Sequence, residues 1–439
     1  MRNALKSLIV VSLYFLEQFK GRSQLQLRHS LLLENIFSMV TLRAMEYILS
    51  FLLVPYLLRT LGPSQYGAIA FMQGIIGYFT LIINYGFNMT APRDIACSSE
   101  KDWPKLFSAY FWSMVLLWMG SSAVFGFGYL FFHEFLSVAL DVRLFFAVYT
   151  SVIGFVIFPI WFFQGIQQMR YITILNLTGR MATIVLLFLL VKSPDDYLTA
   201  AFLQSCTPMF AGIISWLVLY KIMPGLLQKP NKKEIARVFK EGWQIFISTL
   251  AINLYTTSDL VILGALTNNT IVGYYSGADK LINCIKRGIS AVNDAVYPYI
   301  SHLMKDSISQ AFQFLKKQFL VYTICGILGG MLIILFSPRI IPWLLGSKYI
   351  PSIKPLQIMG FVPLIVSMSN VLGYETMLPL GMERDFSRVL IMASVLNLTI
   401  IVPFINWQQA SGVAIAMLIT EIFVTLAMGY VLWRKKILF

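Results

Sequence analysis

The stretch TLRAMEYILSFLLVPYLLRTLGPSQYG, residues 41–67, decides the fold. It starts as an apolar helix and ends in a Leu-Gly-Pro-Ser turn, which predicts that the chain reverses into a second membrane span. Two charges, Arg43 and Glu46, interrupt the apolar run one helical turn apart. Because a charge near the bilayer centre costs roughly 2.5–3.5 kcal/mol, such residues usually face a polar cavity or a partner. We therefore expect this helix to line a water-filled path.

The whole chain has the composition of a membrane protein. Its 439 residues are 58% hydrophobic and 12% charged, whereas soluble proteins carry about 25% charged residues. Apolar runs of about 20 residues, enough to span the hydrocarbon core, recur along it. The net charge of +14 fits the Lys and Arg that cytoplasmic loops collect, and no nucleic-acid-binding motif is present. We predict an all-α integral membrane protein that lies in the lipid bilayer and binds no nucleic acid.

Twelve spans joined by short connections are predicted. They lie near residues 36–58, 66–89, 107–132, 144–164, 171–191, 197–220, 242–265, 271–298, 319–337, 355–380, 388–405 and 410–432. The positive-inside rule favours both termini in the cytoplasm, because the loops on that side then hold most of the Lys and Arg.

A basic connection, residues 221–241, divides the spans six and six. The expected organisation is an N-terminal segment (1–30), an N-lobe (31–220), this linker, and a C-lobe (242–439). The first segment is interpreted as a cytoplasmic, surface-lying amphipathic stretch, or as residues added by a mis-assigned start codon. A faint repeat supports two related lobes: LGPSQYG after the first span has a counterpart in LGALTNNTIVGYY, residues 263–275, after the seventh.

Ionisable residues inside the spans carry the functional prediction. The span at 271–298 is the most polar, and Lys280, Arg287 and Asp294 fall on one face of its helix. Asn283 widens that polar stripe, and Lys286 lies to its side. Excess positive charge in a low-dielectric cavity favours an anionic substrate such as a phosphate. The alternative is that these charges form ion pairs that hold helices together.

The candidate site residues fall into two groups. Those predicted to bind substrate are Arg43, Arg180, Lys280, Asn283, Lys286 and Arg287. Those predicted to act in gating or ion coupling are Glu46, Arg93, Asp259, Asp294 and Glu421. Asp259 is the better coupling candidate because Thr256, Thr257 and Ser258 surround it with hydroxyls. Glu421 is either a proton-coupling site or a neutral, hydrogen-bonded acid in an apolar helix.

The motifs of common catalytic and metal sites are missing from the sequence. The three histidines are far apart, the four cysteines make no CxxC pair, and neither a P-loop nor a GxSxG motif occurs. We therefore predict no catalytic residue, no metal site and no cofactor beyond a coupled proton or sodium ion. The protein is not expected to be an enzyme.

Several motifs together resemble the lipid-linked oligosaccharide flippases (Wzx-type O-antigen flippases). These form the polysaccharide-transporter branch of the multidrug/oligosaccharidyl-lipid/polysaccharide exporter superfamily. The motifs are VPYLLRTLGPSQYGAIAFMQ (54–73), NYGFNMTAPRDIA (84–96), FPIWFFQG (158–165), FISTLAINLY (246–255) and YPYIS (297–301).

The resemblance implies a V-shaped pair of six-helix lobes with alternating access. It implies an undecaprenyl-pyrophosphate-linked sugar repeat unit as substrate, moved across a bacterial inner membrane, and other polysaccharide-assembly proteins, such as a polymerase, as partners. Three alternatives stay open. An exporter of small cationic drugs would need an acidic cavity, and an intramembrane sugar polymerase or ligase would need a sizeable outward-facing loop. A structural scaffold would need no buried cations.

Overall fold

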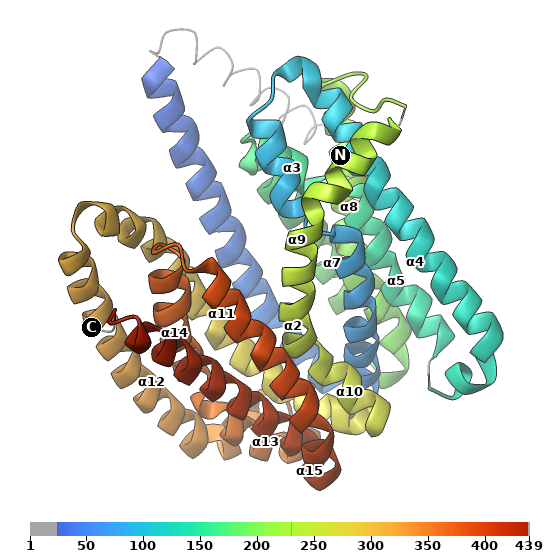
Figure 1. Cartoon of the computed structure of the whole chain (residues 1–439). Helices are drawn as coiled ribbons and strands as arrows, with labels where there is room; N and C mark the ends of the chain where they lie inside the picture. The colour runs from blue at the N-terminus through green and yellow to red at the C-terminus, as the bar shows by residue number, and fades with distance from the viewer. Residues whose placement is uncertain (1–23, 140, 230, 438–439) are drawn as a thin grey trace.

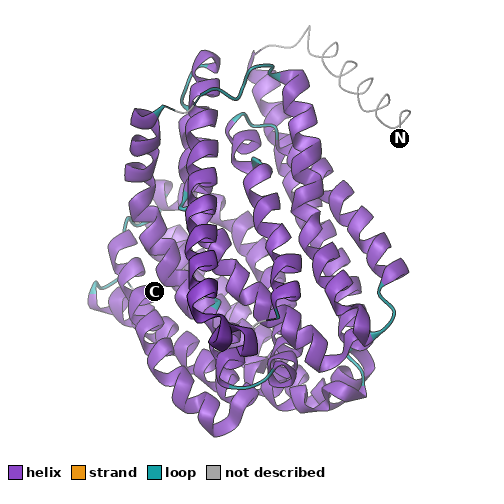
Figure 2. Cartoon of the chain, turned by 90° about the vertical axis from the view of Figure 1, so that its right-hand side faces the viewer, coloured by secondary structure: helices purple, strands orange, loops and turns teal. Residues whose placement is uncertain are grey.

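A computed structural model describes residues 24–139, 141–229 and 231–437. At some helical positions, Arg43, Glu46 and Asp294 among them, the structure describes the backbone but not the side chain. The described chain consists of helices and short connections, and the long helices run side by side with loops at their ends (Figures 1 and 2). Within the described residues, eight helical segments are long and apolar enough to cross a membrane. The predicted all-α membrane class is confirmed.

The helices follow the chain in this order: α2 (Gln24–Asn84), α3 (Phe87–Ala96), η1 (Glu100–Asp102), α4 (Trp103–Ala139), α5 (Val142–Ile157), α6 (Ile160–Gly165), α7 (Met169–Leu190), η2 (Pro194–Asp196), α8 (Tyr197–Ile222), α9 (Lys232–Thr256), α10 (Ser258–Leu266), α11 (Asn269–Asp306), α12 (Ile308–Leu344), η3 (Ser347–Ser352), α13 (Ile353–Ile358), η4 (Met359–Phe361), α14 (Val362–Leu372), η5 (Gly373–Met377) and α15 (Glu383–Arg434).

Two of these helices each contain two predicted spans. In α2 the helix is interrupted at Gly62, whose φ of 74° and ψ of 172° no helical residue adopts, so the predicted reversal lies there. In α15 the interruption lies at Gln408 and Gln409. Helix α2 already includes residues 24–30, and residues 1–23 of the predicted N-terminal segment lie outside the described chain.

Two predicted spans each consist of two helices, although the segment Val142–Gly165 as a whole is long and apolar enough to cross a membrane. The span at 144–164 is divided between α5 and α6, and the span at 242–265 between α9 and α10, which meet at Thr257. The linker predicted at 221–241 is helical from Lys232 onward. The Asn231 side chain caps this helix by accepting from the Lys233 backbone nitrogen at 3.0 Å, and Val238 is fully buried.

Helices α4, α5, α7 and α8 gather on one side of the molecule, and α12, α14 and α15 on the other (Figure 1). Helices α2 and α11 join the two groups through the two segments of the sequence repeat. A Cβ atom on Gly67 would lie 1.8 Å from the Asn269 carbonyl oxygen, and one on Gly273 would lie 2.0 Å from the Pro63 carbonyl oxygen. Glycine is therefore required at both positions of this backbone-to-backbone contact, which we call the glycine contact.

Arg59 reinforces the same end of the molecule. Its guanidinium donates through Nε to the Leu344 carbonyl oxygen at 2.9 Å and through Nη2 to the Trp343 carbonyl oxygen. These carbonyls lie at the carboxyl end of α12, where a cation also interacts favourably with the helix dipole. The glycine contact and Arg59 together hold the two helix groups against each other at this end.

Replacing Gly273 by alanine is expected to lower the melting temperature of the purified protein. The added methyl group would force α2 and α11 apart, and overpacking of this kind costs about 1–3 kcal/mol. Gly288→Ala is the matched control, because it lies on the same helix with nothing within 4 Å of its Cβ position. That control is expected to be neutral or stabilising by about 0.5–1 kcal/mol. Equal melting temperatures for the two variants would contradict the glycine contact.

Candidate functional site

The amphipathic pattern of α11 places its polar residues. The helix is capped by the Asn268 side chain, which accepts from the Ile271 backbone nitrogen at 3.1 Å. One face buries Val272, Ala278 and Ile282 completely, so this face packs against neighbouring helices. Residues three, four and seven positions apart lie on a common face, which brings Lys280, Asn283, Cys284 and Arg287 together on another side.

That polar face of α11 lines a cavity of about 280 Å³. Helices α2, α7 and α8 supply its other walls. Its lining residues are Leu53, Val54, Pro55, Leu57, Tyr66, Gln73, Arg180, Gln204, Lys280, Leu281, Asn283, Cys284 and Arg287. Three of them are cations and none is an acid, so among the described residues this lining is positively charged. We call it the cationic cavity.

The cationic cavity brings together four of the six residues predicted to bind substrate. Arg180, Lys280, Asn283 and Arg287 all line it, although Arg180 comes from a different helix. The stretch 41–67, expected to line a polar path, contributes five of its lining residues, from Leu53 to Tyr66. Arg43 lies on α2 with its side chain outside the described set. At this volume the cavity has room for a compact anionic group rather than a whole oligosaccharide.

Three polar lining residues were missed by the sequence analysis. Gln73, Gln204 and Tyr66 add neutral hydrogen-bonding groups to the cationic cavity. Each is a single uncharged residue in an apolar helix, so neither charge nor helical spacing distinguishes it from ordinary buried polar residues. A search for amide side chains within predicted spans would have found the two glutamines.

A second, smaller cavity of about 70 Å³ lies on another side of α11 and carries acids. We call it the acidic cavity. It is lined by Asp259, Leu260, Tyr275, Asp279, Asn283, Lys286, Asn397, Met417, Thr420 and Glu421. Lys286 therefore lies beside three carboxyl groups, apart from the other two α11 cations. Asn283 lines both cavities, so it marks where they approach each other.

Asp259 is the most enclosed acid of the acidic cavity. It follows the break at Thr257 and lies in the first turn of α10, where a carboxylate interacts favourably with the helix dipole. Its side chain is buried; Tyr275 donates its hydroxyl to Oδ2 at 3.3 Å, while no described residue donates to Oδ1 with the geometry of a hydrogen bond. Asn397 donates to the Thr420 hydroxyl at 3.3 Å and leaves its own Oδ1 unpartnered. These free acceptors and the carboxylate can bind a small cation or a proton.

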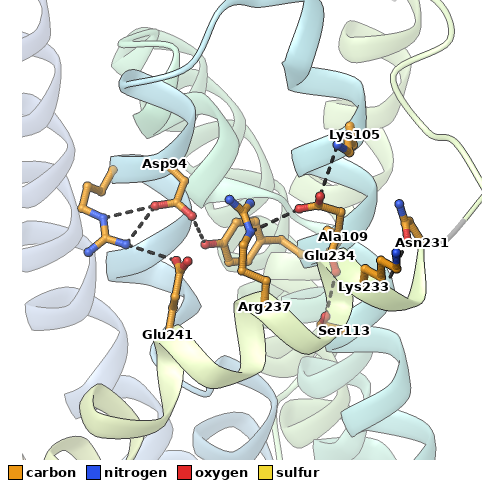
Figure 3. A network of polar contacts seen from close by, with 11 residues as sticks. Asp94, Lys105, Ala109, Ser113, Asn231, Lys233, Glu234, Arg237 and Glu241 are labelled. Atoms are coloured by element: carbon orange, nitrogen blue, oxygen red, sulfur yellow. Dashed lines mark hydrogen bonds and ion pairs between the residues drawn. The ribbon is translucent and has the colours of Figure 1, made fainter.

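Arg93 belongs to a polar network that includes Asp94 and Glu241 (Figure 3), and its helix, α3, lies at the end of the molecule opposite α10 and α13 (Figure 1). From α3 it contacts Asp94 at 2.9 Å and Glu241 of α9 at 3.3 Å. Tyr110 of α4 donates to the other Asp94 carboxylate oxygen at 2.7 Å. Lys105 of α4 also pairs with Glu234 of α9, at 3.2 Å. The network fastens α9 to α3 and α4.

The remaining predicted residues are only partly placed. Glu421 lines the acidic cavity, but no hydrogen bond from its carboxyl group is among those described. Glu46 lies on α2 and Asp294 on α11, and neither side chain is described. Their proposed gating or coupling roles stay predictions.

The positive charge of the cationic cavity can be measured at Cys284, an exposed residue of its lining. In a Cys97→Ser/Cys325→Ser variant the other thiol, Cys206, is buried. At Cys284, the rate of reaction with an anionic methanethiosulfonate divided by the rate with a cationic one is expected to be roughly tenfold higher than the same ratio for a free thiol in solution. The reason is that a cationic cavity concentrates anions. Adding Lys280→Ala and Arg287→Ala should remove most of this preference. A preference for the cationic reagent would contradict the assigned charge.

The fold is similar to that of known transporter structures. The chain superposes on a structure titled "Lipid II flippase MurJ, inward closed conformation", with a TM-score of 0.72, 13% identity, and coverage of 91% of this chain and 87% of that chain. It also superposes on an inward-facing multidrug resistance MATE family transporter of the MOP superfamily, with a TM-score of 0.64, 14% identity, and coverage of 89% and 94%. At these identities the likeness concerns the fold alone.

Two curated proteins, each named "Putative O-antigen transporter", are similar in sequence over nearly their whole length. The one from Escherichia coli (strain K12) is 30% identical over 413 residues, covering 92% of this chain and 97% of that protein. The one from Shigella dysenteriae is 26% identical over 402 residues, covering 90% of this chain and 98% of that protein.

The family predicted from the motifs is confirmed, as is the prediction of a transporter family rather than an enzyme family. The family model described as "Polysaccharide biosynthesis protein" matches residues 32–304, and the chain belongs to that family.

Proposed function

We propose that the protein is a flippase for undecaprenyl-pyrophosphate-linked O-antigen repeat units. It would move them from the cytoplasmic to the periplasmic leaflet of a bacterial inner membrane. The observation that carries this proposal is the cationic cavity, in which Arg180 of α7 lines the same space as Lys280 and Arg287 of α11. The family membership and the names of the two curated relatives support the substrate class.

The substrate would bind in parts. Arg and Lys bind phosphate oxygens well, so the pyrophosphate would occupy the cationic cavity. Gln73, Asn283 and Gln204 would satisfy sugar hydroxyls or remaining phosphate oxygens. The lipid tail would stay in the bilayer between the helix groups. This division avoids moving phosphate and hydroxyl groups through hydrocarbon, where unpaired polar groups are costly.

Transport would proceed by alternating access between two six-helix lobes arranged as a V. The glycine contact and Arg59 would close the periplasmic side in this conformation. Both termini would be cytoplasmic, and the Arg93 network would lie on that side, holding α9 against α3 and α4. Arg93 is largely exposed, so its ion pair is expected to contribute at most about 1 kcal/mol and to adjust rather than determine closure.

Ion coupling would use the acidic cavity. Asp259, with an unpartnered oxygen beside the free Asn397 oxygen, would bind the coupling proton or sodium ion. Asp279, Lys286 and Glu421 would set the charge around it. Because α11 carries residues of both cavities, a change in charge at the acidic cavity would act on the helix that holds the substrate.

The alternative of a small-cation exporter is disfavoured by the sign of the charge in the larger cavity, and the acidic cavity, at about 70 Å³, is too small for a drug-sized cation. A cation would bind poorly in a lining that holds three cations and no acid among the described residues. The relatives and the match to a polysaccharide biosynthesis family likewise favour a sugar-containing substrate over small drugs. A polymerase of the same pathway would be a partner rather than this protein.

Lys280→Ala/Arg287→Ala is expected to abolish most surface polysaccharide in cells. Each lost charge-assisted hydrogen bond should weaken binding by about 1.5–3 kcal/mol, or roughly tenfold or more. Lys316→Ala/Lys317→Ala removes two exposed cations of α12 outside the cavity and should leave polysaccharide unchanged. Wild-type polysaccharide from a normally inserted Lys280/Arg287 variant would refute the binding site.

The same variant separates a flippase from a polymerase. A flippase defect leaves lipid-linked single repeat units on the cytoplasmic side, whereas a polymerase defect displays single units outside.

Asp259→Asn is expected to make transport insensitive to the coupling-ion gradient, because the amide cannot change its charge. Purified protein in liposomes would be supplied with a defined lipid-linked repeat unit, and pH and sodium gradients would be imposed separately. Asp195→Asn, an exposed residue of η2, should keep the wild-type response. A gradient response retained by Asp259→Asn would rule out this residue as the coupling group.

A further inference from the structure

A buried acid that neither cavity contains lies in the π-helical turn η5, Gly373–Met377. The Leu378 backbone nitrogen donates to the Gly373 carbonyl oxygen at 3.2 Å, five residues back, and the Thr376 hydroxyl donates to the Val371 carbonyl oxygen at 2.6 Å. The extra residue of a π turn redirects the side chains around it, and such turns often occur at functional sites. Here Glu375 has no exposed surface.

The hydrogen bonding of Glu375 is half complete. Gln318 of α12 donates through Nε2 to Glu375 Oε1 at 3.1 Å. The second carboxyl oxygen, Glu375 Oε2, and the amide oxygen, Gln318 Oε1, are both buried without a partner. Exchanging the amide oxygen and nitrogen of Gln318 would not complete the hydrogen bonding of the pair, because the amide oxygen would then face a carboxylate oxygen. Both orphaned atoms are acceptors, so the pair lacks a donor.

No cation among the described residues pairs with an ionised Glu375. Ile300, Leu315 and Val371, from α11, α12 and α14, form a buried apolar cluster beside the π turn. Two tyrosines lie close to the π turn: Tyr322 of α12, which interacts with Glu375, and Tyr297 of α11, which packs on Tyr374 with ring centroids 4.5 Å apart.

The charged residues on neighbouring helices lie elsewhere. Lys316 and Lys317 of α12 are exposed, and α15 presents Phe386 and Met428 to Gly373 of the π turn. The side chain of Asp294 on α11 is outside the described set. No ion pair to Glu375 occurs within the described part of the chain, and an unpaired buried carboxylate is costly.

We propose that Glu375 and Gln318 form a proton-binding site. One proton taken from water converts the Glu375 carboxylate to a carboxylic acid, whose hydroxyl at Oε2 donates to Gln318 Oε1. The two side chains then make two reciprocal hydrogen bonds, and a single proton satisfies both orphaned acceptors. A metal cation fits less well, because it needs about six oxygen ligands and the two side chains provide only two free oxygens.

The site connects α12, the π turn and α11. Gln318 and Glu375 join α12 to the π turn, and one turn further along α12 the Tyr322 hydroxyl donates to Asn293 Oδ1 of α11 at 2.6 Å. Helix α11 also carries Lys280 and Arg287, so loss of the proton would disturb the support of the cationic cavity. This site is separate from Asp259 and goes beyond the proposed flippase function.

Infrared spectroscopy of the purified full-length protein at neutral pH tests the proposal directly. A protonated carboxyl group has a carbonyl stretching band distinct from the bands of a carboxylate. The wild-type spectrum minus that of Glu375→Gln is expected to contain one carboxylic-acid band. A carboxylate band in its place would overturn the proposal. The measurement needs no substrate, so its outcome is independent of whether the protein is a flippase.

Two further variants separate the site from a general effect on folding. Glu383→Gln changes an exposed glutamate at the start of α15 and should remove a carboxylate band and no carboxylic-acid band. Gln318→Leu removes the amide partner and should shift the carboxylic-acid band to higher frequency, because the acid loses its hydrogen bonds. Glu375→Gln itself should melt near the wild-type temperature, since two amides can pair in the same way. An unshifted acid band in Gln318→Leu would mean that Gln318 does not share the proton.

Discussion

The contact between the backbones of α2 and α11 is the constraint on which the rest of the structure depends. Gly67 and Gly273 remove the side chains that would separate the helices, and the two segments meet at carbonyl and amide groups. Van der Waals packing, rather than the hydrophobic effect, drives association within a bilayer, so close approach of small residues is an efficient way to join helices. This contact sets how α11 faces α2, α7 and α8.

The orientation of α11 divides its charges between two cavities. Lys280 and Arg287 face Arg180 across the cationic cavity, while Lys286 and Asp279 contribute to the acidic cavity with Asp259 and Glu421. One helix thus separates an anion-attracting surface from an acid-rich one, and Asn283 contacts both. Such an arrangement suits a transporter in which charge at one cavity influences the other, as we propose.

Unsatisfied polar atoms in the second half of the chain point to the same chemistry in two places. Asp259 Oδ1, Asn397 Oδ1, Gln318 Oε1 and Glu375 Oε2 are all acceptors without a donor. Buried acceptors are rarely left unpaired, and a proton or a small cation is the missing partner that requires the least space. A transporter that changes conformation can use such groups because their pairing differs between states.

The amino-acid sequence was sufficient to predict the membrane class, the family and four residues of the cationic cavity, Arg180, Lys280, Asn283 and Arg287. Composition gave the class, the motif VPYLLRTLGPSQYG gave the family, and the spacing of Lys280, Asn283 and Arg287 by helical turns gave one polar face. Periodicity is sufficient for these conclusions, because a helix in a bilayer satisfies the hydrogen bonds of its own backbone and its residues fall on faces fixed by their spacing.

Which helices face one another became clear only from the three-dimensional structure. It placed Arg180 with Lys280, moved Lys286 to the acids, and interrupted the helices at Thr257 and in the π turn that buries Glu375. These outcomes depend on contacts between residues distant in sequence and on local backbone irregularities, and neither leaves a periodic signal in the chain.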